Sequence, residues 1–206
     1  MDTQMIVLSG IDGSGKSTLM RHLKDYAAAN GHDDWLFLDL WQRGFETGLI
    51  QDKDTIMSAM YAMDDDERGF FIADLVYQIV DSFEDADARL VFVDSYWFKY
   101  AAHEIARGHE IPHYEAYFTC EDRVKHVFHI STAASTAWDR KQPDVSRYEC
   151  GGLDISRENF IRQQTQVDKE IRSLISAYPS TVLPEGATSE QWRDVVVDAL
   201  ETGEPV

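Results

Sequence analysis

A glycine-rich segment near the start of the chain constrains its fold more than any other feature. Residues 10–18 read GIDGSGKST, which matches the phosphate-binding pattern G-x-x-x-x-G-K-[ST]. The apolar run at 5–8 predicts a buried strand before this segment, and the periodicity of residues 16–29 predicts a helix after it. A strand, a glycine-rich turn and a helix are the context in which the pattern forms a phosphate-binding loop.

Such a loop predicts binding of a nucleoside triphosphate. Its glycines let backbone N–H groups point at phosphate oxygens, and the helix that follows adds positive potential. We expect Lys16 to reach the β- and γ-phosphates, and we expect the Ser17 hydroxyl to ligate Mg²⁺. The residues expected to bind ATP are Gly10, Asp12, Gly13, Ser14, Gly15, Lys16, Ser17 and Thr18.

Strand and helix patterns alternate along the rest of the chain. Further strands are predicted at 35–40, 90–94, 124–130 and 180–183. Helices are predicted at 54–61, 67–82, 98–107, 132–140, 156–178 and 189–201. The alternation predicts an α/β fold, a three-layer sandwich in which helices flank a five-stranded parallel sheet and ligands bind at the carboxyl ends of the strands. We expect one domain over residues 1–206, with a lid segment at 132–152.

The composition limits the partners of this protein. The chain has 37 acidic and 19 basic residues and a formal net charge of −18, which repels nucleic-acid backbones and anionic membranes. Solubility, or an organism with an acidic proteome, suffices to explain the acidity. Cys120 and Cys150 are too few and too far apart to indicate a disulfide scaffold or a zinc site. We expect a cytoplasmic protein with ATP and a small-molecule acceptor as its partners.

Two groups of charged residues are candidates for the chemistry. Asp94 ends an apolar strand, so its carboxylate should face the phosphate loop and help to hold Mg²⁺; capping of the next helix is the alternative role. Arg140, Lys141 and Arg147 form the strongest cationic cluster, in a segment at 140–152 that is either a lid over the site or a plain surface loop. A mobile arginine there could neutralise the charge that develops during phosphoryl transfer. We expect Lys16, Asp94, Arg140 and Arg147 to be the catalytic residues, with Ser17 and Asp94 as the metal ligands.

Three further patterns have competing interpretations. The aromatic stretch at 96–100 could line a base-sized pocket or pack in the core. The acidic run at 64–67 is explained by the start of a helix, because adjacent residues do not share the helix face that a metal cluster needs. His126 and His129 lie in a buried strand pattern and are predicted to be core or edge residues.

These residues together resemble the thymidylate kinase family of nucleoside monophosphate kinases. The phosphate loop has the acidic third residue of that family, and residues 144–149 (DVSRYE) are similar to its lid stretch. The helix that follows, with Phe160 and Arg162, also resembles the family, as does the order of elements over nearly the whole chain. Gly13 in the loop and Arg140 in the lid are similar to the subtype that carries its extra arginine in the lid. The resemblance implies a P-loop kinase fold and, by analogy, a homodimer.

The resemblance also implies where an acceptor would bind. In the family the loop carboxylate contacts the acceptor sugar and a helix phenylalanine stacks on the base, roles that would fall to Asp12 and Phe71. The full set of residues expected to bind the acceptor is Asp12, Arg43, Phe71, Ser95, Tyr96, Lys99 and His103.

The chain departs from the family at the arginines that hold the acceptor phosphate. Ser95 stands where the family's Asp-Arg-Tyr/His motif has its arginine, and Leu75 replaces the arginine of its Phe-x-x-x-Arg helix motif. Each such arginine is worth about 1.5–3 kcal/mol, so the loss of both would weaken monophosphate binding by roughly a hundredfold or more. Arg43, or Lys99 one helical turn beyond Ser95, could compensate.

Three functions remain open at this point. The first is an ATP-dependent kinase of a pyrimidine nucleoside monophosphate, dTMP or a modified relative. The second is a kinase of the same fold for an acceptor without a phosphate: a nucleoside, a sugar or a specialised metabolite. The third is a nucleotide-binding regulatory module without transfer activity, against which the retained Lys16, Ser17 and Asp94 argue.

Overall fold

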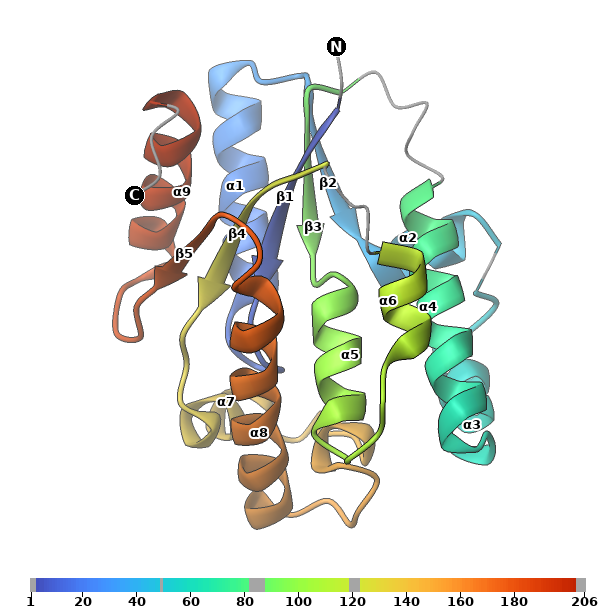
Figure 1. Ribbon diagram of the computed structural model, residues 1–206. Coiled ribbons are helices and arrows are strands. Elements are labelled where there is room, and N and C mark those ends of the chain that lie inside the picture. The colour runs from blue at the N-terminus through green and yellow to red at the C-terminus, as the bar shows by residue number, and fades with distance from the viewer. Residues whose placement is uncertain (1–2, 49, 82–87, 119–122, 203–206) are drawn as a thin grey trace.

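A single parallel sheet forms the centre of the molecule. The computed structural model describes residues 3–48, 50–81, 88–118 and 123–202. The five strands have the order β2-β3-β1-β4-β5 (Figure 1). They are β1 (Gln4–Ser9), β2 (Trp35–Asp39), β3 (Leu90–Asp94), β4 (Val124–Ile130) and β5 (Ser180–Leu183). The predicted five-stranded parallel α/β sandwich is confirmed.

Helices cover both faces of the sheet. On one face lie α1 (Lys16–Asn30) and α9 (Ser189–Thr202), and on the other lie α4 (Asp65–Asp81), α5 (Trp97–Ile105) and α8 (Arg157–Ile175) (Figure 1). The remaining helical elements are α2 (Leu40–Glu46), α3 (Lys53–Ala62), α6 (Pro112–Phe118), α7 (Ala134–Lys141) and the 3₁₀ turn η1 (Tyr148–Cys150).

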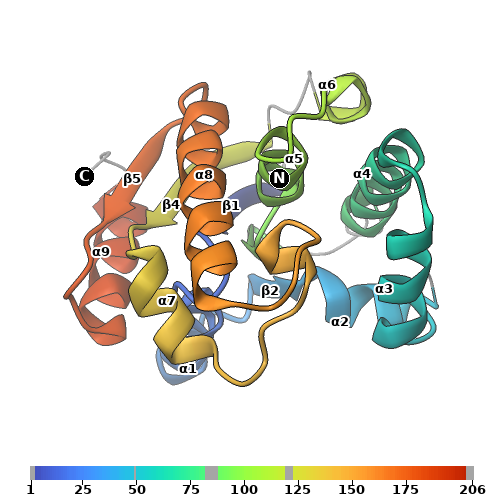
Figure 2. The ribbon, with the colours of Figure 1, turned by 90° about the horizontal axis from the view of Figure 1, so that it is seen from below.

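Both faces of the sheet are covered by helices (Figure 2), and β1 and β3 are accordingly apolar and buried over most of their length. In β1, Ile6 and Leu8 pack towards α1 and α9, whereas Val7 packs in the core on the opposite face. The strand therefore ends between two rigid layers. This rigidity fixes where the phosphate loop begins.

The sequence analysis did not predict two short helices, α2 and α6, and the first of them makes β2 shorter than predicted. Strand β2 ends at Asp39 rather than residue 40, because the Asp39 side chain accepts hydrogen bonds from the backbone N–H groups of Trp41 (2.9 Å) and Gln42 (3.0 Å). An aspartate at the N-cap starts a helix in this way, so α2 begins at Leu40. The second missed helix is α6.

The acidic run before α4 is a helix start, as predicted. Backbone N–H of Glu67 donates to Asp64 Oδ1 at 2.9 Å, and backbone N–H of Asp64 donates to Glu67 Oε2 at 3.2 Å, which is a reciprocal capping box. The end of the predicted helix at residue 82 lies outside the described residues, as does Cys120. No helix in the described ranges is both long and apolar enough to cross a membrane.

The two strand histidines are structural, as predicted. His129 is fully buried in β4 with its Nε2 at 3.0 Å from Asp168 Oδ1. His126 Nε2 lies 2.9 Å from the Thr181 hydroxyl on the neighbouring strand. Both contacts join elements of the sandwich, β4 to α8 and β4 to β5.

Candidate functional site

Three neighbouring strands end together beside the phosphate loop. In the parallel register Asp94 of β3 pairs with Asp39 of β2 on one side and with Leu8 of β1 on the other. The strand ends open into a cavity of about 580 Å³, which we call the loop cavity. Its lining residues are Asp12, Gly13, Gly15, Lys16, Ser17, Thr18, Asp39, Trp41, Asp94, Ser95, Lys99, Tyr100, Arg140, Lys141 and Asp144.

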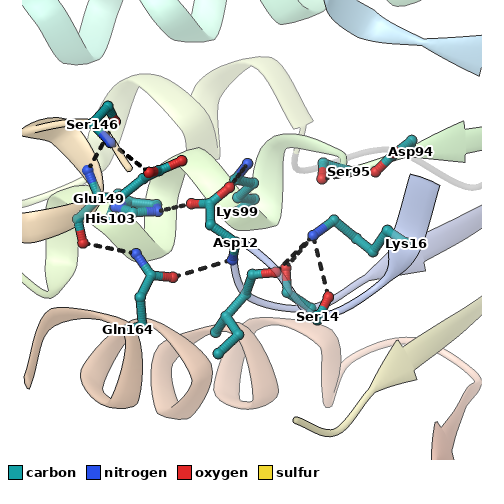
Figure 3. Close-up of polar contacts among 12 residues, drawn as sticks. Asp12, Ser14, Lys16, Asp94, Ser95, Lys99, His103, Ser146, Glu149 and Gln164 are labelled. Carbon is teal, nitrogen blue, oxygen red and sulfur yellow. Dashed lines mark hydrogen bonds and ion pairs between the residues drawn. The ribbon is translucent and has the colours of Figure 1, made fainter. Parts of the chain in front are cut away.

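Close packing fixes the shape of the phosphate loop. Gly13 has a φ of +79°, and a Cβ there would lie 2.6 Å from the backbone oxygen of Ala137 in α7. Only glycine fits this approach in a left-handed conformation. Lys16 Nζ donates to the backbone oxygens of Gly10 (2.9 Å) and Ile11 (2.8 Å), so its side chain folds over the loop (Figure 3).

Lys16 is also electrostatically unusual. Burial, together with the nearby charge of Lys99, lowers its pKa to about 8, although Asp94 and Asp12 oppose the shift. The ammonium group is therefore mostly charged at neutral pH, and it loses its charge as the pH rises through about 8. An anion bound at the loop would restore the ordinary preference for the charged form.

Ser17 and Asp94 form a pair of hard oxygen ligands. The Ser17 hydroxyl donates to Asp94 Oδ2 at 3.0 Å, and the Ser95 hydroxyl donates to the other carboxylate oxygen at 3.2 Å. This donor set fits Mg²⁺, which takes few protein ligands and completes its shell with phosphates and water. In the described part of the chain no group of three or more His, Cys, Asp or Glu could hold a metal by itself, so phosphate oxygens would have to complete such a site.

The structure brings three lining residues to the cavity that the sequence analysis did not assign, Asp39, Trp41 and Asp144, and Tyr100 of the aromatic stretch at 96–100 also lines it. A signal for Asp39 was present, because it ends an apolar strand just as Asp94 does. The register between β2 and β3 places the two aspartates on neighbouring strands, about 5 Å apart along the sheet. Trp41 and Tyr100 also line an adjoining apolar pocket with Leu40, Ile50 and Met60.

Asp12 lies at the centre of a polar network on the wall of the loop cavity. Its carboxylate is 2.6 Å from Lys99 Nζ and 3.3 Å from His103 Nε2 (Figure 3). Burial opposes ionisation of Asp12, but Lys99 and His103 outweigh it and hold the pKa of Asp12 well below its usual range. The backbone N–H of Asp12 donates to Gln164 Oε1 at 3.2 Å, and Gln164 in turn donates to the backbone oxygen of Glu149 at 3.0 Å. The network thus ties the phosphate loop to α5, α8 and η1.

The predicted cationic cluster divides between two places. Arg140 and Lys141 line the loop cavity, where Arg140 donates to the backbone oxygen of Ser14 at 3.2 Å and Lys141 pairs with Glu149 at 2.9 Å. Arg147 does not line this cavity in the structure. Burial of Val145, Tyr148 and Cys150 turns η1 so that Arg147 faces a second cavity, where it donates to the backbone oxygen of Gly152.

Several predicted acceptor residues also lie elsewhere. Tyr96 is 1% exposed and packs edge-to-face on Phe98 and Phe118, so for this residue the core interpretation of the aromatic stretch is correct. Phe71 packs against the core on α4 and is not a lining residue of the loop cavity. Arg43 lies 3.6 Å from Glu46 on α2, away from the cavity.

Three other predicted site residues, Gly10, Ser14 and His103, are buried and do not line the loop cavity. Gly10 and Ser14 are buried below the surface of the loop. His103 is fully buried and reaches the cavity only through Asp12. Of the predicted acceptor residues, Asp12, Ser95 and Lys99 line the cavity.

Sheet order, loop and flanking helices define the P-loop kinase fold. No protein-family model matches the sequence, and neither does any curated protein. Among solved structures, deoxyadenosine kinase from M. mycoides with the products dCMP and a flexible dCDP is similar, with a TM-score of 0.64 and 11% identity over 98% of this chain and all of that one. The same enzyme with bound dATP aligns with a TM-score of 0.59 and 12% identity over 96% of this chain and all of that one. At these identities the likeness shows the fold.

Proposed function

We propose that this chain is an ATP-dependent kinase that phosphorylates a hydroxyl group of an unphosphorylated, nucleoside-like acceptor. The observation that carries the proposal is the distribution of charge around the loop cavity. Lys16 and Arg140 lie on the side of the phosphate loop, and neither is in an ion pair within the described residues. The cavity also contains Asp39, Asp94 and Lys99, and the charge of Lys99 is already balanced by the loop aspartate, Asp12.

The donor half suits a triphosphate. Backbone N–H groups of the loop and the ammonium of Lys16 would hold the phosphates, and Ser17 with Asp94 would hold Mg²⁺. The ion, when bound, neutralises charge on the phosphate oxygens. Arg140, anchored on the loop, would stabilise the charge of the transferring phosphoryl group.

The acceptor half suits an alcohol. Asp39 would accept the proton as the acceptor oxygen bonds to the γ-phosphorus, while the bond from that phosphorus to the bridging oxygen breaks and ADP leaves. Trp41 and Tyr100 would contact the ring of the acceptor at the entrance of the apolar pocket that they share. The nucleoside kinase named among the similar structures supports a nucleoside as this acceptor.

A second candidate function is phosphorylation of a nucleoside monophosphate, as the resemblance to thymidylate kinases implies. The observation that favours it is the position of Lys99, which lines the acceptor side of the cavity. Lys99 would have to exchange its contact with Asp12 for the acceptor phosphate.

A coupled ADP-release screen over nucleosides and nucleoside monophosphates tests both candidates. We expect turnover with at least one nucleoside, and we expect Lys16→Ala to abolish it while the fold remains intact. Turnover of monophosphates alone would replace the first candidate by the second. If the protein binds ATP but none of the nucleosides or nucleoside monophosphates causes release of ADP, both proposals are contradicted.

A further inference from the structure

A second cavity is rich in basic side chains, although the protein as a whole is acidic. It has a volume of about 610 Å³ and lies between α4, the end of α5, η1 and the start of α8. Four arginines line it in a chain that has only 19 lysines and arginines. Its lining residues are Met60, Asp65, Arg68, Ala106, Arg107, His109, Arg147, Tyr148, Gly151, Gly152, Leu153, Arg162 and Gln163. We call it the arginine cavity. None of these residues lines the loop cavity.

Two of the arginines are already paired and form the floor. Arg68 and Arg107 share the buried carboxylate of Glu104, at 3.0 Å and 3.5 Å, and Arg68 also pairs with Asp65. The guanidinium of Arg107 lies over the ring of Tyr148, with 4.4 Å between its central carbon and the ring centroid. These contacts fix the two groups in place.

The other two arginines bring positive charge that nothing in the described chain balances. Arg147 donates to the backbone oxygen of Gly152, and Arg162 donates to the side-chain oxygen of Asn159. Neither forms an ion pair with any described residue, in contrast to Arg68 and its two carboxylates. Both Arg147 and Arg162 are exposed, so a ligand can reach them.

Two buried donors on the same wall lack a partner. Gln163 is 8% exposed, and its Nε2 has no hydrogen-bond partner among the described residues. The same holds for Nε of Arg107. The amide oxygen of Gln163 lies close to Gly151, where a Cβ would approach it to 2.7 Å. Buried donors without partners are costly, and an acceptor-only ligand would satisfy them.

We propose that the arginine cavity binds a small multivalent anion, a phosphate- or carboxylate-bearing molecule, at Arg147, Arg162 and Gln163. Guanidinium groups bind both kinds of oxyanion in bidentate geometry, and the volume admits a metabolite of modest size. The proposal does not depend on the kinase activity, because the cavity shares no lining residue with the loop cavity.

The test uses a protein whose phosphate loop has been disabled. In Lys16→Ala, calorimetric titration with inorganic pyrophosphate and, separately, with citrate measures anion binding without the loop lysine, and the arginine variants described next assign that binding to the arginine cavity. We expect one binding site for at least one probe, and the tighter probe identifies the ligand as phosphate- or carboxylate-bearing. Addition of Arg147→Gln or Arg162→Gln should weaken binding at least about tenfold. Neither change should affect folding, because both side chains are exposed.

The matched control is Arg21→Gln in the same background. Arg21 is exposed on α1 and does not line either cavity, so this change alters the net charge equally and should leave the affinity within about twofold. No binding of either probe by Lys16→Ala would overturn the proposal. Equal weakening by Arg21→Gln would overturn it as well, because the effect would then be general electrostatics. Unchanged affinity in Arg147→Gln and Arg162→Gln would do the same.

Discussion

Lys99 Nζ lies 2.6 Å from Asp12 Oδ1, and this contact joins helix α5 to the phosphate loop on the wall of the loop cavity. Both side chains are largely buried, with 17% and 11% exposed. The contact means that Lys99, which lines the loop cavity, already has a counter-charge. It also means that the conformation of the loop depends on a residue 87 positions away in sequence.

Replacement of this lysine should destabilise the protein through the aspartate that remains. Lys99→Met leaves the Asp12 carboxylate buried without its main counter-charge, which we expect to cost about 3–5 kcal/mol of the free energy of unfolding at pH 7. The double variant Asp12→Asn/Lys99→Met should recover a large part of that loss. Urea denaturation of the single and double variants measures the cycle. Additive effects would contradict a direct interaction.

The same pair predicts a dependence of stability on pH. In the wild-type protein the pKa of Asp12 is lower in the folded state than in the unfolded state, so its contribution is present above the unfolded value and is lost as pH falls through the folded one. In Lys99→Met burial opposes ionisation, so the stability gap to the wild type should narrow between pH 7 and pH 4. A gap that stays constant over this range would show that Asp12 does not titrate as proposed.

Affinity for ATP should fall as pH rises through about 8. Lys16 has a pKa of about 8, so below that value it carries the positive charge that the phosphates need, and above it the charge is lost. Equilibrium binding of a fluorescent ATP analogue with Mg²⁺ from pH 6.5 to 9.5 measures the effect. The arginine in Lys16→Arg keeps its charge over this range. The affinity of this variant for ATP should therefore stay constant between pH 6.5 and 9.5, even if it differs from that of the wild type. A parallel fall in both proteins would assign the dependence to another group.

Asp39→Asn should lower kcat while the fold is retained. Asparagine caps a helix as well as aspartate does, so α2 should survive, but the amide cannot accept the acceptor proton. General-base catalysis contributes about 10²–10⁴-fold, which sets the expected loss of kcat for the acceptor found in the screen. The matched control is Asp52→Asn, which caps α3 outside the loop cavity. Similar losses in the two variants would argue against a catalytic role for Asp39.

Ser95→Arg tests whether the missing arginine explains the choice of acceptor. Ser95 lines the loop cavity next to Asp94, so an arginine there would supply a charge for an acceptor phosphate. We expect the ratio of kcat/KM for monophosphate over nucleoside to rise at least about tenfold. Ser95 has a φ of +62°, so some strain accompanies any long side chain. Ser95→Gln controls for this strain, and an equal shift in both variants would rule out the charge as its cause.

The sequence by itself determined the class of the fold and predicted the residues of the phosphate loop. Residues 10–18 are contiguous, and their glycines, lysine and serine carry the loop geometry within one short segment. The alternating apolar patterns were sufficient for the sandwich because each strand and helix buries a face that its own residues define.

Only the tertiary structure decided which other residues line the loop cavity. Asp39 and Asp94 come from different strands and meet because β2 and β3 pair in parallel register, which no local pattern specifies. Tyr96 does not line the loop cavity because its side chain packs in the core beside Phe98 and Phe118. Arg147 lines the second cavity instead of the loop cavity because its neighbours Val145 and Tyr148 are buried in the core. The direction of a side chain at the end of an element depends on what packs behind it, and that packing involves residues distant in sequence.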